Sequence, residues 1–362
     1  MRPHTTRPVA AVIAAALLLT ACSSGDEPTD PTTSEPAAAT SETATTDGAF
    51  PVTLDTVMGQ VTIDAKPQRV VTLGSHEHEY LYSLGVAPVA VPVSWQGYDS
   101  GSGPWAEADR LAAGAEPETF EPGTTAYDAE AIAAFEPDLI VATYPNHEMT
   151  QEEYALLSGV APVVTRPATD SAGVKTVEWG VSLADELAIL GAATGTADKA
   201  AAIAAEVEAS FEAVRDDHPE WEGKSSTVGF FYEGQAGVYA SSDTRNQFLG
   251  RLGLNVDAVE GASDAWLPIS AEQLDVLGGL DSIVWQVASD PTLYDSITGL
   301  PLFASLGTTA KGGHVWITDS ILEGAFFANS PSSIQCALTA FVPQLEAALD
   351  GDPATEVPPY SD

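Results

Sequence analysis

Two histidines and two glutamates stand side by side in the stretch VVTLGSHEHEYLYSLGV, residues 70–86. Imidazole and carboxylate groups are common protein ligands of divalent transition metals. In an extended segment His76 and His78 share one face, and His147 in the stretch YPNHEM supplies a third imidazole for a bare metal ion. In a helix the side chains of His76 and His78 point about 200° apart and cannot hold one ion. The pattern also lacks the His-Glu-x-x-His spacing of zinc proteases.

A second interpretation places the same stretch at the start of a helix. Ser75 is then the N-cap, and Glu77 and Glu79 gain from the positive end of the helix dipole. His76 projects toward a ligand as a hydrogen-bonding residue. We take this interpretation as the prediction, with the three-histidine metal site as the alternative.

Basic residues are scarce, so each one in a loop is informative. The chain has 13 Lys and Arg against 52 Asp and Glu, and its net charge is −39. Arg245 and Arg166 follow predicted strands, and a guanidinium group suits anionic oxygen atoms of a ligand. For Arg166, an intramolecular salt bridge is an equal alternative among so many acids.

Aromatic side chains also gather in the predicted loops. Some must be core residues, but several suit a large, flat, partly apolar ligand. They are Trp95, Tyr98, Trp105, Tyr144, Tyr232, Tyr239 and Trp285. All of these except Tyr239, together with His76, Arg166 and Arg245, form the predicted ligand-binding set.

Short runs rich in Val, Ile and Phe alternate with helical patterns along the body of the chain. RVVTLG, DLIVATYP and SIVWQV are almost continuously apolar, which is typical of strands buried on both faces. Strands separated by helices predict mainly parallel sheets. Ligands of such sheets bind beyond the carboxyl ends of the strands, so these loops are expected to line one cleft.

The middle of the chain predicts a helical connector. It is dominated by Ala, Glu, Leu and Asp, and Thr196 can cap a helix of about residues 197–217. Such a helix is roughly 30 Å long and can join two lobes. The predicted fold is α/β, with two Rossmann-like lobes of mainly parallel sheet joined by a long rigid helix. The expected boundaries are 51–176 for the N-terminal lobe, 177–218 for the connector, 219–350 for the C-terminal lobe and 351–362 for a tail.

The two lobes look like distant copies. DAEAIAAFEPDLIV begins at Asp128 and SAEQLDVLGGLDSIVW begins at Ser270. Each starts with an N-cap residue, then Ala and Glu, and each runs through an Asp into a strand. The shared glutamates are Glu130 and Glu272, although chance similarity between two βα units is the alternative.

The N-terminus has the features of a secretory signal. Residues 1–22 hold two arginines, a short apolar run and then Leu-Thr-Ala before Cys22. This resembles the bacterial lipobox, in which Cys22 becomes the lipidated first residue of a protein anchored to the outer face of the cell membrane; a plain signal peptide is the alternative. Residues 23–50 are mostly Ser, Thr, Pro, Ala and acids, with no Lys or Arg, which predicts a disordered tether.

Two classes of function are disfavoured by the sequence. So few basic residues cannot form a nucleic-acid surface. The chain has no Gly-x-Ser-x-Gly motif and no phosphate-binding glycine loop, so an enzyme is not expected.

Several stretches resemble the class III (cluster A) substrate-binding lipoproteins of ABC importers. They are VTIDAKPQRVVTLG, YLYSLGVAPVAV, EPDLIV, ISAEQLDVL and PLFASLGTTAKGGHVWI. GPWA, HPEWEGK and FLGRLGL are similar to stretches of the ferric-siderophore-binding members. The resemblance implies a monomer with little hinge motion that has no cofactor, performs no catalysis and holds a ferric siderophore between its lobes. Arg245 and Arg166 would then face anionic oxygens bound to Fe(III).

The resemblance also implies a partner. One glutamate on each lobe, here Glu130 and Glu272, would dock on arginines of the two ABC permease subunits. The alternative is that each is a surface residue favoured by its helix dipole. Haem or cobalamin is the alternative ligand, followed by a bare transition metal held by His76, His78 and His147. The class of siderophore stays open.

Overall fold

The computed structural model describes residues 49–93, 98, 100–122, 126–145, 147–261, 266–290 and 292–357. Cys22, the signal sequence, almost all of the predicted tether and Trp95 lie outside the described residues. No helix within the described ranges is long and apolar enough to cross a membrane.

The N-terminal lobe is built on a five-stranded parallel sheet in the order β5-β4-β3-β6-β7. Its strands are β3 (Val70–Thr72), β4 (Ala90–Pro92), β5 (Glu118–Phe120), β6 (Leu139–Ala142) and β7 (Val163–Thr165). Every residue of β3, β4, β6 and β7 is buried, as their apolar runs predict. An antiparallel hairpin precedes the sheet, made of β1 (Val52–Thr56) and β2 (Gly59–Ile63). The helices of this lobe are α1 (Glu77–Ser83), η1 (Pro104–Ala106), α2 (Glu107–Ala112), α3 (Ala129–Ala133) and α4 (Gln151–Ser158).

The C-terminal lobe has a mixed sheet in the order β10-β9-β8-β11-β12. Its strands are β8 (Ser226–Tyr232), β9 (Gln235–Tyr239), β10 (Trp266–Ile269), β11 (Ser282–Gln286) and β12 (His314–Ile317). β8, β11 and β12 are parallel, whereas β9 is antiparallel to β8 and β10. Glu233 and Gly234 both have positive φ angles, of 50° and 83°, so the β8–β9 turn is a tight hairpin. The helices are η2 (Pro219–Trp221), α7 (Thr244–Arg251), η3 (Ala271–Leu277), α8 (Thr292–Thr298), η4 (Phe303–Ser305), α9 (Gly307–Ala310), α10 (Ser320–Ala328) and α11 (Pro331–Leu349).

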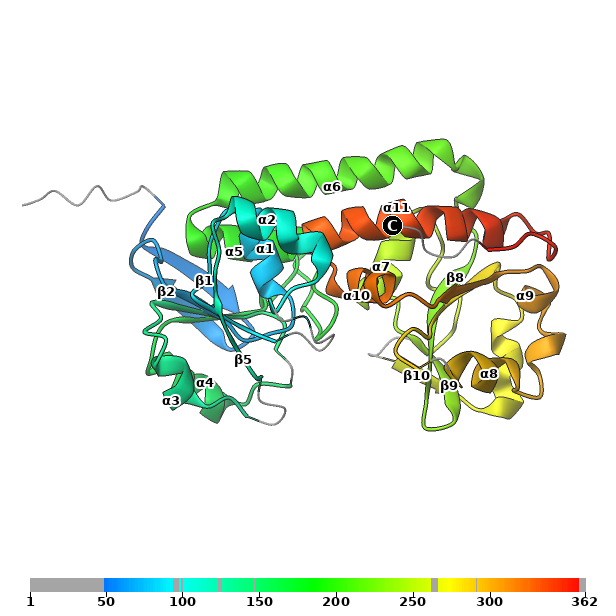
Figure 1. Cartoon of the computed structure of the whole chain (residues 1–362), viewed down its shortest axis with the longest axis horizontal. Coiled ribbons are helices and arrows are strands. Elements are labelled where there is room, and N and C mark those ends of the chain that lie inside the picture. The colour runs from blue at the N-terminus through cyan, green and yellow to red at the C-terminus, as the bar shows by residue number, and fades with distance from the viewer. Residues whose placement is uncertain are drawn as a thin grey trace, which may run out of the picture. The chain divides into compact units, whose positions relative to one another are not determined.

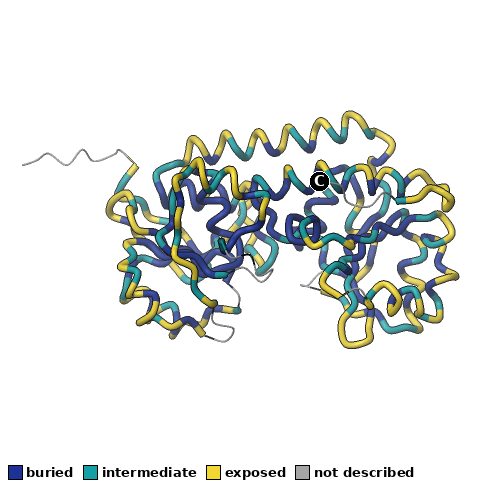
Figure 2. The backbone as a smooth tube through the Cα atoms, viewed as in Figure 1, coloured by how far each residue is buried: buried dark blue, intermediate teal, exposed yellow. Residues whose placement is uncertain are grey.

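Helix α5 (Leu183–Thr194) ends at Gly195, which is left-handed with φ 68°, and α6 (Ala197–Asp217) follows it. The bounds of α6 agree with the helix expected from the sequence, and the α/β fold with two joined lobes is confirmed. Helix α11 packs against α6 and contacts α1 and η1 of the first lobe and β11 and β12 of the second (Figure 1). Much of α6 is exposed, whereas the strands of both sheets are largely buried (Figure 2). One apolar core includes residues of both sheets and of these helices, so the lobes share their packing.

The two sheets are built alike at their central strand pair. Just before β6, the carboxylate of Asp138 accepts hydrogen bonds of 2.8 Å from the backbone N–H groups of Gln68 and Arg69, which precede β3. Just before β11, Asp281 accepts one of 2.9 Å from the backbone of Ser225, which precedes β8. The equivalent contacts support the internal similarity seen in the sequence.

Candidate ligand-binding site

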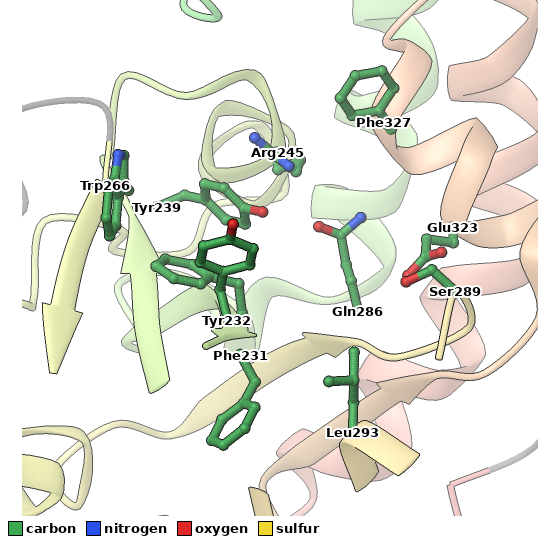
Figure 3. Close-up of a pocket in the computed structure, with 11 residues that line it drawn as sticks. Phe231, Tyr232, Tyr239, Arg245, Trp266, Gln286, Ser289, Leu293, Glu323 and Phe327 are labelled. Carbon is green, nitrogen blue, oxygen red and sulfur yellow. The ribbon is translucent and has the colours of Figure 1, made fainter. Parts of the chain in front are cut away.

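A cavity of about 480 Å³ lies in the C-terminal lobe, with a mainly aromatic lining. Strands β8 to β11 and helices α7, α8 and α10 all contribute to it. The lining residues are Phe230, Phe231, Tyr232, Tyr239, Arg245, Trp266, Gln286, Ser289, Leu293, Glu323 and Phe327. Figure 3 shows Tyr239, Tyr232 and Trp266 toward one side and Glu323 with Ser289 toward the other. Such a lining suits a large, partly apolar ligand that is fixed by a few polar contacts.

Arg245 lies at this cavity, but its charge is already paired. Asp243, the N-cap of α7, accepts hydrogen bonds of 2.7 and 2.8 Å from Nε and Nη2 of Arg245. The guanidinium carbon lies 3.5 Å from the centre of the Tyr239 ring. Burial alone would lower the pKa of Arg245, but the Asp243 carboxylate outweighs it and holds the pKa above its usual range. Arg245 is therefore a fixed cation with a fixed counter-ion.

Glu323 is a cavity residue that the sequence analysis missed. It lies on α10, is 3% exposed, and its Oε2 has no hydrogen-bond partner in the structure. Burial raises its pKa to about 7, although hydrogen bonds from the backbone of Ala288 and Ser289 act in the opposite sense. The signal in the sequence was a lone carboxylate on an otherwise apolar helix, SILEGAFFA.

The N-terminal lobe and the start of the connector supply aromatic residues that reach the other lobe. The His76 ring lies 4.2 Å from that of Tyr144 and 6.0 Å from that of Phe327, which lines the cavity. Trp179, which the sequence analysis also missed, lies 4.8 Å from Tyr144 and 6.0 Å from Phe327. The Tyr144 hydroxyl is 3.4 Å from that of Thr244 in α7. His76 and Tyr144 thus lie where the two lobes meet.

The His-Glu-His-Glu stretch is buried as a whole, which corrects the N-cap prediction. The N-cap of α1 is His76 and not Ser75, and His76 makes no side-chain capping bond. Burial lowers the pKa of His76 to about 3 and that of His78 to about 4, so both are neutral. His78 Nε2 donates a 2.7 Å hydrogen bond to the carbonyl oxygen of Gly101.

The two glutamates of this stretch hold loops and helices together. Glu77 accepts a 2.9 Å hydrogen bond from the backbone N–H of Tyr144. Glu79 accepts hydrogen bonds from the backbone of Gly103 at 3.1 Å and from Nε1 of Trp105 at 2.8 Å. Burial raises the pKa of each glutamate to about 7. Both lie in the first turn of α1, as predicted, but they are buried and connect parts of the fold.

The structure does not assemble the three-histidine metal site. His147 Nε2 is 2.7 Å from a carboxylate oxygen of Glu153, which is also the capping-box residue of α4. Among the described residues, no group of three or more His, Cys, Asp or Glu side chains could hold a metal ion. The alternative that depends on His76, His78 and His147 is therefore not supported.

Three further residues of the predicted ligand-binding set do not line the cavity: two lie where the lobes meet and one lies in the core. Trp105 and Tyr98 pack edge to face at 5.8 Å, and both lie close to Gly324 of α10, where an added Cβ would come within 2.7 Å of the Trp105 ring. Trp285 is a core residue and not a cavity residue, because it is fully buried and its Nε1 donates to His314 at 3.1 Å.

Tyr232 and Arg166 both lie in loops or strand ends, as expected. Tyr232 lines the cavity and is 66% exposed. Arg166 lines a much smaller cavity, of about 10 Å³, that it shares with Tyr144, Glu178 and Trp179. Its Nε is buried without a hydrogen-bond partner in the structure, so the salt bridge considered from the sequence does not engage that atom.

The chain is similar to known proteins over most of its length. The model of the periplasmic binding protein family matches residues 70–322. A crystal structure of a periplasmic solute binding protein from Mycobacterium smegmatis is 30% identical, with a TM-score of 0.69 over 82% of this chain and 98% of that one. The structure of PiaA from Streptococcus pneumoniae in complex with ferrichrome is 24% identical, with a TM-score of 0.71 over 83% of this chain and 99% of that one.

One relative is named for a different ligand, cobalamin. A cobalamin-binding protein from Halobacterium salinarum is 27% identical over 250 residues, which are 67% of this chain. The matched region spans 60% of the length of that relative.

Proposed function

The chain belongs to the periplasmic binding protein family, and we propose that it is the extracytoplasmic solute-binding component of an ABC importer for a ferric siderophore. The observation that carries this proposal is the cavity of about 480 Å³, whose aromatic walls suit a bulky chelate. His76 of the N-terminal lobe and Trp179 of the connector approach the cavity residue Phe327, and Tyr144 packs against both of them. The ligand then lies between the lobes and contacts both.

Two features of the lobes support little hinge motion on ligand binding. Helices α6 and α11 both connect the lobes, and α11 belongs to a core that contains residues of both sheets. Domain closure would have to disrupt this packing, because protein interiors are close-packed. We propose that the protein captures its ligand by small side-chain and loop adjustments, acts as a monomer and performs no catalysis.

Delivery requires a membrane partner. Glu130 and Glu272 are exposed in the first turns of α3 and η3, one in each lobe. We propose that they dock on basic residues of the two permease subunits, and that lipid on Cys22 keeps the protein at the outer face of the cell membrane. Residues 23–50 would act as the tether.

Cobalamin is the second candidate ligand, because of the name of the Halobacterium salinarum relative. Haem is a third large, flat ligand that an aromatic site can accept. Both carry a planar macrocycle, and both would use the same cavity.

A fluorescence titration tests the assignment, because the chain has seven Trp residues and Trp266 lines the cavity. The panel is a set of ferric siderophores, haem, cobalamin and free divalent metal ions. We expect saturable quenching with at least one ferric siderophore at submicromolar concentration and none with free metal. Tight binding of cobalamin or haem alone would make that compound the ligand in place of the siderophore. Tight binding of a free metal ion alone would contradict the siderophore, cobalamin and haem assignments.

A further inference from the structure

We propose that the C-terminal cavity selects ferric complexes that carry no net negative charge and that present a hydrogen-bond donor, preferably an ammonium group, to Glu323. This inference rests on the proposed function, since it takes the ligand to be a ferric siderophore. The inference restricts the ligand to one charge class of ferric siderophore, whereas the sequence leaves the class of siderophore open.

The first argument concerns the positive charge of the cavity. Arg245 is the only basic side chain among the described residues that line it. Both oxygens of Asp243 accept hydrogen bonds from its guanidinium group, so the pair has no net charge. The segments after residue 48 that lie outside the described residues contain no Lys or Arg. An anionic complex would therefore find no uncompensated cation in this cavity.

The second argument concerns the negative charge. Glu323 adds a carboxyl group to a cavity whose other charges are already matched. Its Oε2 is buried and lacks a hydrogen-bond partner, and such an acceptor is satisfied when a ligand donates to it. The polar residues that line the cavity with Glu323 include Ser289, which lies beside it, and Gln286, Tyr239 and Arg245 from β11, β9 and α7 (Figure 3). An ammonium group would both donate to this oxygen and match its charge, whereas a ligand carboxylate would be repelled.

The net charge of a ferric chelate depends on its chelating groups, so the charge preference of the cavity indicates a class of ligand. Three hydroxamate groups neutralise Fe(III), whereas three catecholates leave the complex strongly anionic. The net charge of −39 on the chain adds long-range repulsion of anionic complexes. Arg166, a further cation, lines a separate small cavity together with Glu178. The cavity thus favours a hydroxamate-type complex that carries a free amine.

The test compares two ligands that differ by one charge. Ferric desferrioxamine B carries a free ammonium group, and its N-acetylated form does not. Ferric enterobactin serves as the anionic catecholate. Dissociation constants are measured by fluorescence quenching at a pH near 8, where a carboxyl group with a pKa of about 7 is mostly ionised. The readout is the ratio of the two desferrioxamine constants, in the wild-type protein and in Glu323→Gln.

We expect the wild-type protein to bind the ammonium form about tenfold more tightly than the acetylated form, and Glu323→Gln to bring this ratio close to one. The matched control is Glu152→Gln, at an exposed position of α4, which should keep the wild-type ratio. The wild-type ratio needs no variant, so the test holds even if Glu323→Gln folds poorly. The inference would be overturned if the wild-type protein bound the two desferrioxamine complexes with equal dissociation constants, or if their ratio were unchanged in Glu323→Gln. Tighter binding of ferric enterobactin than of ferric desferrioxamine B would also overturn it. If none of the three complexes binds, the inference fails as well, and the wider ligand panel above then decides the siderophore assignment.

Discussion

Glu79 and Ser330 are 251 residues apart in the sequence and 2.6 Å apart in the structure, where the serine hydroxyl donates to Oε2 of the glutamate. The same hydroxyl accepts a hydrogen bond of 3.2 Å from the backbone N–H of Ser333, so it also caps α11. Trp105 donates to the same glutamate oxygen. One carboxylate thus ties helix α1 of the N-terminal lobe to the start of the second helix that connects the lobes.

Ser330→Ala should lower the free energy of unfolding by about 1–3 kcal/mol, because it removes a helix cap and leaves a buried carboxyl group short of a donor. Urea unfolding measures the change. Ser332→Ala is the matched control, since its Oγ is buried without a hydrogen-bond partner, and it should be nearly neutral. Equal losses in the two variants would show that the Glu79 contact adds little.

The contribution of Glu186 to stability should fall as the pH rises from about 5 to about 8. Burial, with a smaller effect of the Glu77 charge, raises the pKa of Glu186 from 4.5 to about 8. A carboxyl group with a raised pKa in the folded state gives stability that is complete below its unfolded pKa and is lost as the pH passes its folded pKa. Glu186→Gln should reduce the fall by on the order of 1–3 kcal/mol, measured by unfolding at a series of pH values. Glu206→Gln, at an exposed position of α6, is the control and should follow the wild-type curve. Parallel curves for all three proteins would contradict the prediction.

Asp243→Asn should strengthen the binding of anionic ferric complexes. Asparagine caps a helix as well as aspartate does, so α7 should keep its N-cap while Arg245 loses its counter-ion. We expect up to about tenfold tighter binding of a ferric catecholate, about 1.4 kcal/mol, in fluorescence titrations. Asp128→Asn changes the N-cap of α3 in the other lobe and should leave the affinity unchanged. An unaltered affinity in Asp243→Asn would mean that the guanidinium group does not contact the ligand.

The Glu130→Ala/Glu272→Ala double variant should bind ligand normally but transport it poorly. Both side chains are exposed, so the fold loses little. Each exposed ion pair with the permease is worth only about 0.2–1 kcal/mol, and the two together fix orientation more than affinity. Uptake of radioactive iron by cells measures the effect, and charge reversal to Lys should lower it further. The matched control removes Glu152 and Glu220, which are also exposed. Normal uptake in the double alanine variant would assign the docking surface elsewhere.

Cys22→Ser should move the protein from the membrane fraction to the soluble fraction without loss of ligand affinity. Acyl chains supply the membrane binding, and the acidic, Ser- and Thr-rich tether has no apolar face of its own. Cell fractionation with immunoblotting is the measurement, and Cys336→Ser is the control. A variant that stays in the membrane fraction would contradict the lipid anchor.

The sequence alone determined the buried parallel strands, such as β3, β6 and β11, and the length of the connecting helix, but it did not single out the β1–β2 hairpin, β9, β10 or α11. Runs such as LIVA in β6 act locally, through apolar periodicity, so a single sequence contains them. Thr196 is the N-cap residue of α6, as predicted, although its side chain makes no capping hydrogen bond. The equivalence of Asp138 and Asp281 was also visible, because both lobes repeat the same βα pattern.

Tertiary structure alone decided which polar and aromatic residues face a ligand. Local rules place the His76–Glu79 stretch at a helix start but say nothing of its burial; α11, from the far end of the chain, packs against α1 and supplies Ser330 as a partner. Trp285 belongs to the core because β12 places His314 beside it, whereas Trp266, on the edge strand β10, borders the cavity. Glu323 became a candidate only when packing buried its carboxyl group without a partner for Oε2. Burial and partner choice depend on contacts between segments far apart in sequence, and periodicity within one segment does not encode them.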